Sequence, residues 1–143
     1  MAKSFSAQVS DLVAKYEKRM NATFKGSVQD LVEDVTTPTA QGGNMRVWSG
    51  FLRSSLMAST SSMPLIDRDA RPPSDAAPNS YQPDDNAIEA VILGARIGET
   101  LFLGFVASYA GYREALDHFV LSAAQKWPVI VRKNAARAVA AFR

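Results

Sequence analysis

The sequence of 143 residues contains no cysteine and only one histidine, His118. Without cysteine the chain can form neither disulfide bonds nor thiolate metal sites, and it has no thiol nucleophile. It also lacks any run of about 18 apolar residues, so the sequence predicts no membrane-spanning helix and no membrane partner. The first residues lack the apolar core of a signal peptide, from which we expect synthesis in the cytoplasm.

Side chains that could catalyse a reaction are scarce as well. His118 follows Asp117 near the expected start of the last helix, where capping or packing is commoner than general-base catalysis. The sequence has no phosphate-binding glycine loop, no metal-ligand spacing and no nucleophile elbow. The aspartates between residues 64 and 86 do not have the spacing of an EF-hand. We therefore predict that the chain is not an enzyme and has no catalytic residues, cofactor or metal site.

What the sequence does contain is typical of one folded domain spanning residues 1–143. Hydrophobic residues make up 47% of the chain and charged residues 21%, which are ordinary values for a globular domain of this length. The net charge of +2 is too small to predict nucleic-acid binding by the molecule as a whole. A C-terminal segment without acidic residues either stabilises the end of a helix or contacts DNA phosphates, through Arg132, Lys133, Arg137 and Arg143.

Two helical patterns lie at the ends of the chain. Apolar residues recur every three or four positions from Phe5 to Val35, which predicts a long amphipathic helix within residues 1–36. The glycine at position 26, followed by a capping-box pattern, leaves a pair of shorter helices as an alternative. A similar pattern predicts a C-terminal helix over residues 115–143, which Pro128 should kink or restart.

The segment Trp48–Leu56 links the long N-terminal helix to the rest of the chain. Ser49 and Gly50 form a turn-and-cap signal, because glycine adopts unusual backbone conformations and serine accepts hydrogen bonds from backbone amides. The apolar spacing that follows predicts a short helix that ends near residues 59–62, with Arg53 pointing outward.

The remaining stretches predict a loop and a β-hairpin. Residues 64–86 contain five of the seven prolines, so we expect a long loop there that becomes ordered against neighbouring subunits. Two apolar runs separated by a glycine-containing turn predict a β-hairpin over residues 87–107. Both of its faces are apolar, and we expect one of them to contact another chain. The elements together predict an α+β fold, in which the two terminal helices pack on a small antiparallel sheet beside a long Pro-rich loop.

Three motifs follow one another along this chain. The first ends in RVWSGFLRSSL at residues 46–56, the second is YAGYRE at residues 109–114, and the third is FVLSAAQKW at residues 119–127. In this order they resemble the tail-completion, or neck, proteins of long-tailed bacteriophages and gene transfer agents.

The first motif is similar to the family's Pro-Val-Asp-Thr-Gly-x-Leu-x-x-Ser-Leu, but Trp48 and Ser49 replace its Asp-Thr. The second is similar to Tyr-Ala-x-x-x-Glu, with Ala115-Leu116 in place of the Tyr-Gly or Phe-Gly that follows it in the family. The third is similar to Phe-Val-Arg-x-Ala-Ala-Gln-x-Trp. The resemblance spans nearly the whole chain.

This resemblance implies a non-enzymatic virion protein at the head–tail interface that assembles as a homo-oligomeric ring, commonly a hexamer. Its expected partners are a tail tube or tail terminator protein and head-closure or adaptor proteins, with DNA passing through the lumen without sequence-specific binding. The alternatives are a tail terminator or head-closure ring of the same neck, and a small DNA-binding protein.

The residues expected to hold the subunit fold and the ring contacts are Trp48, Gly50, Leu52, Arg53, Tyr109, Tyr112, Arg113, Glu114, Phe119 and Trp127. Among them Arg53, Arg113 and Glu114 either form charge pairs between elements or chains or are ordinary exposed charges that contribute little.

Overall fold

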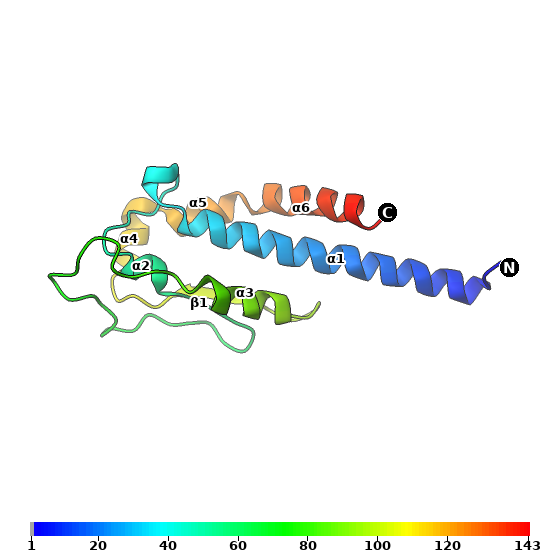
Figure 1. The fold of residues 1–143 in the computed structure, drawn as a ribbon, viewed down its shortest axis with the longest axis horizontal. Coiled ribbons are helices and arrows are strands. Elements are labelled where there is room, and N and C mark those ends of the chain that lie inside the picture. Colours follow the sequence, from blue (N-terminus) through cyan, green and yellow to red (C-terminus); the bar gives the residue numbers. More distant parts are fainter. Residues whose placement is uncertain (1) are drawn as a thin grey trace.

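The computed structural model describes residues 2–143, which form six α-helices and one two-stranded antiparallel sheet (Figure 1). The predicted α+β fold is confirmed. The helices are α1 (Phe5–Thr36), α2 (Phe51–Ser54), α3 (Asp85–Gly94), α4 (Ala110–Asp117), α5 (Phe119–Gln125) and α6 (Trp127–Ala141). The strands are β1 (Leu56–Ser59) and β2 (Phe102–Phe105), and a short 3-10 helix spans Thr39–Gln41.

Helix α1 is a single continuous helix, so the alternative of two shorter helices is wrong. The Ser4 side chain caps its start by accepting a hydrogen bond from the Ala7 backbone amide at 3.2 Å, and the helix ends two residues before Pro38. The helix continues through Gly26, at which α6 packs against it. A Cβ atom at Gly26 would overlap Oδ1 of the buried Asn134, whose Nδ2 donates to Asp30 of α1 at 2.8 Å. Glycine therefore permits the close approach of the two helices.

The predicted C-terminal helix over residues 115–143 is wrong as one element, because three helices occupy this part of the chain. Helix α4 begins earlier, at Ala110, and ends at Asp117; the next residue, His118, has a φ of 55°, in the left-handed region. The helical structure is interrupted again at Lys126, between α5 and α6, and Pro128 lies in the first turn of α6. The predicted restart at this proline is confirmed, since proline is tolerated where the backbone amide has no helical partner.

The predicted β-hairpin over residues 87–107 is wrong, and its first half is helix α3. The Asp84 side chain caps this helix by accepting from the Ala87 backbone amide at 3.1 Å, and Ile88 and Ile92, one turn apart, are buried. A short apolar run of this kind fits a buried helix as well as a strand, so its local pattern does not decide between them.

The strand that pairs with β2 comes from the segment in which the sequence predicted a short helix after Gly50. That helix stops at Ser54, and Leu56–Ser59 then pairs with Phe102–Phe105, with Leu56 opposite Phe105. The expectation of a helix reaching residues 59–62 is therefore wrong. A partner more than 40 residues away decided the conformation, as is common for β structure.

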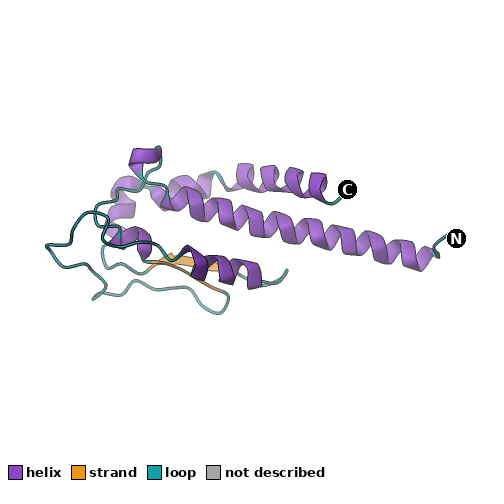
Figure 2. Cartoon of the chain, in the orientation of Figure 1, coloured by secondary structure: helices purple, strands orange, loops and turns teal. Residues whose placement is uncertain are grey.

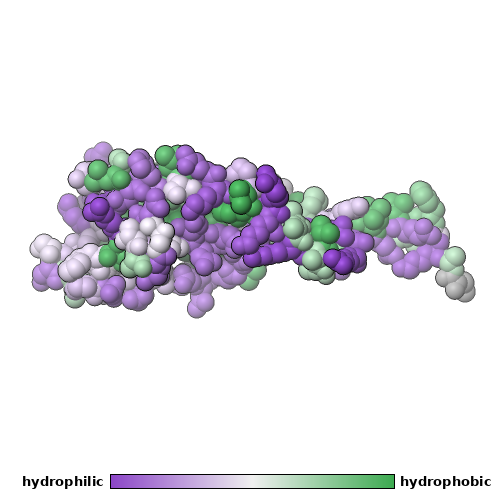
Figure 3. Space-filling model, turned by 90° about the horizontal axis from the view of Figure 1, so that it is seen from above, coloured by the Kyte–Doolittle hydropathy of each residue, from purple (hydrophilic) through white to green (hydrophobic). Residues whose placement is uncertain are grey.

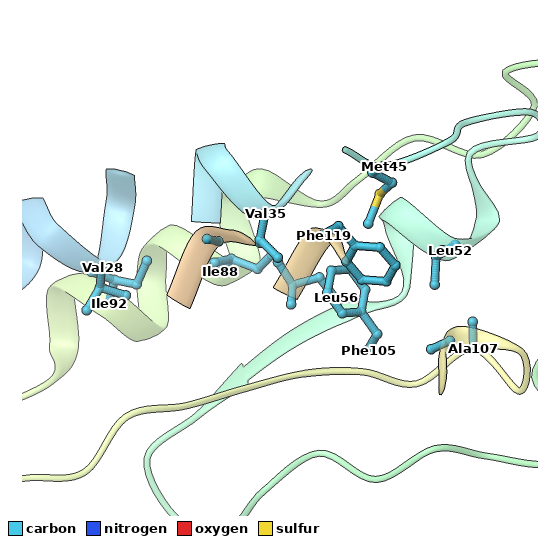
Figure 4. Close-up of a cluster of buried hydrophobic side chains, with 12 residues drawn as sticks. Val28, Val35, Met45, Leu52, Leu56, Ile88, Ile92, Phe105, Ala107 and Phe119 are labelled. Carbon is cyan, nitrogen blue, oxygen red and sulfur yellow. The ribbon is translucent and has the colours of Figure 1, made fainter. Parts of the chain in front are cut away.

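The hydrophobic core lies where α1, α3, the sheet and α5 meet (Figure 4). Phe119 and Phe105 contact each other edge to face, with ring centroids 5.2 Å apart. Val35 of α1 and Leu56 of β1 lie beside Phe119 in the close-up of Figure 4. Secondary-structure elements from all parts of the chain thus meet in one core.

The long loop between β1 and α3 is held by its own chain, whereas the sequence led us to expect ordering against neighbouring subunits. The loop passes around the end of the molecule at which α2 and α4 lie (Figure 2). The backbone amides of Asn79 and Tyr81 donate to the carbonyls of Trp48 and Ser49, each at 2.8 Å. The Asp67 amide donates to the Val106 carbonyl at 2.9 Å.

The N-terminal half of α1 extends past the other elements, and its end is far from the sheet (Figure 1). The last helix reaches back along α1 only as far as Arg19, whose Nε donates to the Phe142 carbonyl at 2.9 Å. The preceding part of α1 is therefore exposed on most of its surface.

Candidate functional site

The structure brings the first two motifs together around a pocket of about 280 Å³. Residues 46–53 form one side of this pocket, and Tyr109 and Arg113 of the second motif form the other. Six of the candidate residues therefore line one site: Trp48, Gly50, Leu52, Arg53, Tyr109 and Arg113. We call this site the motif pocket.

Gly50 shapes the turn at this pocket, as the sequence predicted. Its φ is 86°, which favours glycine, and the Ser49 hydroxyl accepts from the Phe51 backbone amide at 3.3 Å. A Cβ atom at Gly50 would overlap the Tyr81 carbonyl oxygen. The glycine thus lets the Pro-rich loop pack directly against the start of α2.

Aromatic rings connect the two motifs and the loop. Phe51 contacts Tyr81 edge to face at 5.1 Å between centroids, and it stacks on Tyr109 at 6.4 Å. Burial raises the pKa of the Tyr109 hydroxyl, and a hydrogen bond with the Leu52 backbone lowers it by a smaller amount. Tyr109 is therefore neutral at physiological pH and serves as a packing and hydrogen-bonding group.

The raised pKa of Tyr109 predicts a loss of stability in alkaline solution. A tyrosine whose pKa is higher in the folded state than in the unfolded state stabilises the fold fully below the unfolded pKa of about 10. This contribution decreases as pH rises through the higher, folded pKa. We expect the thermal unfolding midpoint of the wild-type protein to fall more steeply above pH 10 than that of the Tyr109→Phe variant. Equal slopes for the two proteins would contradict this assignment.

The charged residues of the second motif pair within their own chain. Arg113 donates two hydrogen bonds to Asp117, at 3.0 and 2.6 Å, and Arg46 lies 3.6 Å from the same carboxylate. Glu114 accepts from the Val120 and Leu121 backbone amides at 2.8 and 3.0 Å, which caps the start of α5. Arg113 and Glu114 are thus accounted for by intrachain contacts.

Arg53 differs from its expected outward position. Its Nε atom is buried and finds no hydrogen-bond partner among residues 2–143. Its side chain lies between the motif pocket and a second hollow bounded by α1 and α3.

Of the other candidate residues, some are buried in the core and others are exposed to solvent. Leu52 and Phe119 are buried in the core, where they hold the subunit fold. Trp48 is 70% exposed and Tyr112 is 67% exposed, so both can contact a partner without rearrangement. Trp127 is half-buried and packs against the core. Trp48 beside three arginines, Arg46, Arg53 and Arg113, has the composition of a protein-interface hot spot.

Another hollow, separate from the one bounded by α1 and α3 and not predicted from the sequence, lies on the side of β2 and α5. This apolar groove holds about 710 Å³, and Glu114 is the single ionisable residue among the residues that line it. Its floor is made of core side chains, among them Leu56 and Phe105, and its wall includes the exposed Met63, Leu65 and Ile66. The adjacent apolar residues Leu65 and Ile66 in the Pro-rich loop are the one sequence signal that could have indicated this groove.

Comparison of the chain with known protein families, curated proteins and solved structures finds no relative. Within residues 2–143, no helix is both long and apolar enough to cross a bilayer. The same residues contain no group of three histidine or acidic side chains arranged to hold a metal ion.

Proposed function

We propose that this protein is a structural component of a phage neck, a ring-forming tail-completion protein that joins the tail tube to the head-closure or connector proteins. The observation that carries the proposal is the amount of apolar surface that a single chain leaves exposed, on the N-terminal half of α1 and in the apolar groove. Contiguous exposed apolar surfaces of this kind mark interaction sites.

The motif pocket supports the same proposal. The first two of the three motifs that resemble neck proteins meet on one surface, at which exposed Trp48 lies beside arginines. This arrangement is typical of an interface, because tryptophan, tyrosine and arginine are the residue types that dominate the energetics of protein interfaces. In this proposal the subunit is part of the virion, at the head–tail interface.

Two other functions predict different behaviour. A tail terminator or head-closure ring of the same neck would share the ring and differ in its neighbours. A small DNA-binding protein would use the basic residues of α6, of which Arg132 and Lys133 are exposed, and would bind duplex DNA with a steep dependence on salt.

The proposal is tested by removing the gene from the phage or gene transfer agent that encodes it. We expect filled heads and complete tails to accumulate separately, and purified protein added to such a lysate to restore joined particles. Joined, infectious particles in the absence of the protein would overturn the proposal. If heads and tails still join but the tails have irregular lengths, a tail terminator role would be favoured. If they join but the heads lose their packaged DNA, a head-closure role would be favoured.

The exposed tryptophan provides a matched variant for the same assay. We expect Trp48→Ala to fold normally, since its side chain lies outside the core. It should restore joining at least about tenfold less well than the wild-type protein, because truncating a tryptophan at an interface hot spot costs about 2 kcal/mol or more. Val129→Ala is the control, because Val129 on α6 is exposed and lies away from the motif pocket.

A further inference from the structure

The projecting half of α1 carries an apolar stripe that its own chain leaves uncovered. Hydrophobic side chains are visible along this projecting part in Figure 3. The stripe consists of exposed residues at helical spacings of three and four, namely Phe5, Val9, Leu12, Val13, Tyr16 and Met20. This is the spacing with which an amphipathic helix places its anchors in a hydrophobic groove.

The apolar groove at the other end of the molecule is a suitable acceptor for such a helix. Exposed Met63, Leu65 and Ile66 form one wall, and Val120 and Ala124 of α5 line it as well. Glu114 already has both carboxylate oxygens hydrogen-bonded to α5. An apolar helix face would therefore enter the groove without leaving either carboxylate oxygen of Glu114 without a hydrogen bond.

The stripe cannot reach the groove of its own chain. Leu31 and Val35, near the C-terminal end of α1, themselves line the groove. Leu12 lies 19 residues earlier on the same unbroken helix, about 28 Å away at 1.5 Å per residue. Because a continuous helix does not fold back on itself, the stripe can enter such a groove only in another molecule.

Charge favours a second copy of this chain as that molecule. Residues 2–20 contain four basic and two acidic side chains, whereas residues 67–69, which follow the groove wall at Ile66, are two aspartates and one arginine. Asp67 and Asp69 directly follow the groove wall and are exposed. The helix that carries the stripe is thus net positive, and the segment beside the groove is net negative.

We infer that the α1 stripe of one subunit inserts into the apolar groove of the next, and that this head-to-tail contact builds the ring. Donor and acceptor are different surfaces at opposite ends of one chain, so the contact is heterologous and repeats until the assembly closes. This inference rests on the proposed function, since it names the surface by which the neck ring forms.

Cross-linking tests the contact directly, because the chain has no cysteine of its own. Leu12→Cys in the stripe is mixed with Leu65→Cys in the groove wall, and the mixture is oxidised. We expect a two-chain product that contains one copy of each variant. Lys18→Cys, on the opposite face of α1 by helical spacing, is the control and should give at least about tenfold less product with Leu65→Cys.

A second pair of variants measures the energetic contribution. We expect Leu12→Asp combined with Tyr16→Asp to weaken self-association at least about 100-fold, because two apolar anchors become charged. Both side chains are about half exposed, so the thermal unfolding midpoint should stay near that of the wild-type protein. Val129→Asp, an exposed apolar residue on α6, should leave association unchanged.

Several outcomes would overturn the inference. A Leu12→Cys homodimer in place of the mixed product would mean that stripes pair with each other. Rings that persist in the double aspartate variant would mean that another surface closes them, which leaves the neck function standing. Conversely, a confirmed stripe–groove contact in a protein whose deletion leaves heads and tails joined would refute the proposed function alone.

Discussion

Replacing Phe119 with alanine is expected to lower the free energy of unfolding by about 3–5 kcal/mol, the usual cost of removing a buried phenylalanine side chain. Phe119 is almost fully buried, and its ring meets that of Phe105 edge to face. The surrounding elements are α1, the sheet and α5, so their collapse into the cavity would require several of them to move together. Urea unfolding followed by circular dichroism measures the change.

Phe142→Ala is the control for this prediction, because Phe142 lies at the end of the chain and is only partly buried. We expect it to cost about 1–2 kcal/mol, less than Phe119→Ala, since Phe142 is 36% exposed and its removal leaves no closed cavity. If Phe119→Ala cost no more than Phe142→Ala, the core described here would be wrong.

Replacing Gly50 with alanine is expected to cost about 2–4 kcal/mol, from two separate sources. An L-residue in the left-handed region costs about 1–2 kcal/mol, and the new Cβ would also overlap the Tyr81 carbonyl. The overlap would push the Pro-rich loop away from α2 and weaken the hydrogen bond from the Tyr81 amide to the Ser49 carbonyl.

Gly98 separates the two contributions. Its φ is 96°, close to that of Gly50, but no atom lies within 4 Å of a Cβ placed there. We therefore expect Gly98→Ala to cost only the conformational part, about 1–2 kcal/mol. Limited proteolysis should cut the loop over residues 60–84 faster in Gly50→Ala than in Gly98→Ala. Equal stability and equal cleavage in the two variants would contradict the contact between Gly50 and the loop.

Much of the helical structure could be predicted from the sequence, because its signals are local. The long apolar period of α1, the turn at Gly50 and the restart at Pro128 each depend on neighbouring residues. The continuity of α1 through Gly26 did not follow from local signals. Gly26 instead makes room for Asn134 of a helix more than 100 residues away.

The sheet could not be predicted for the same reason. The segment Leu56–Ser59 is a strand because Phe102–Phe105 lies beside it, and residues 85–94 form a helix although their apolar residues also fit a strand. β structure depends on partners that periodicity does not reveal.

The candidate sites divide in a similar way. The two motifs that line the motif pocket are visible in the sequence. That they contact each other, through Phe51 and Tyr109, is visible only in the structure. The apolar groove is assembled from α1, both strands, the Pro-rich loop and α4 to α6. No single stretch of sequence carries its pattern, so it became visible only in three dimensions.

The mass of the purified protein in solution tests the central claim most directly. Light scattering across a concentration series should give a mass that rises from that of one 15.5 kDa chain to a plateau at a fixed multiple of it, as a closed ring requires. A mass of one chain at every concentration, together with tight binding of added duplex DNA in low salt, would contradict the assembly role and favour a DNA-binding protein.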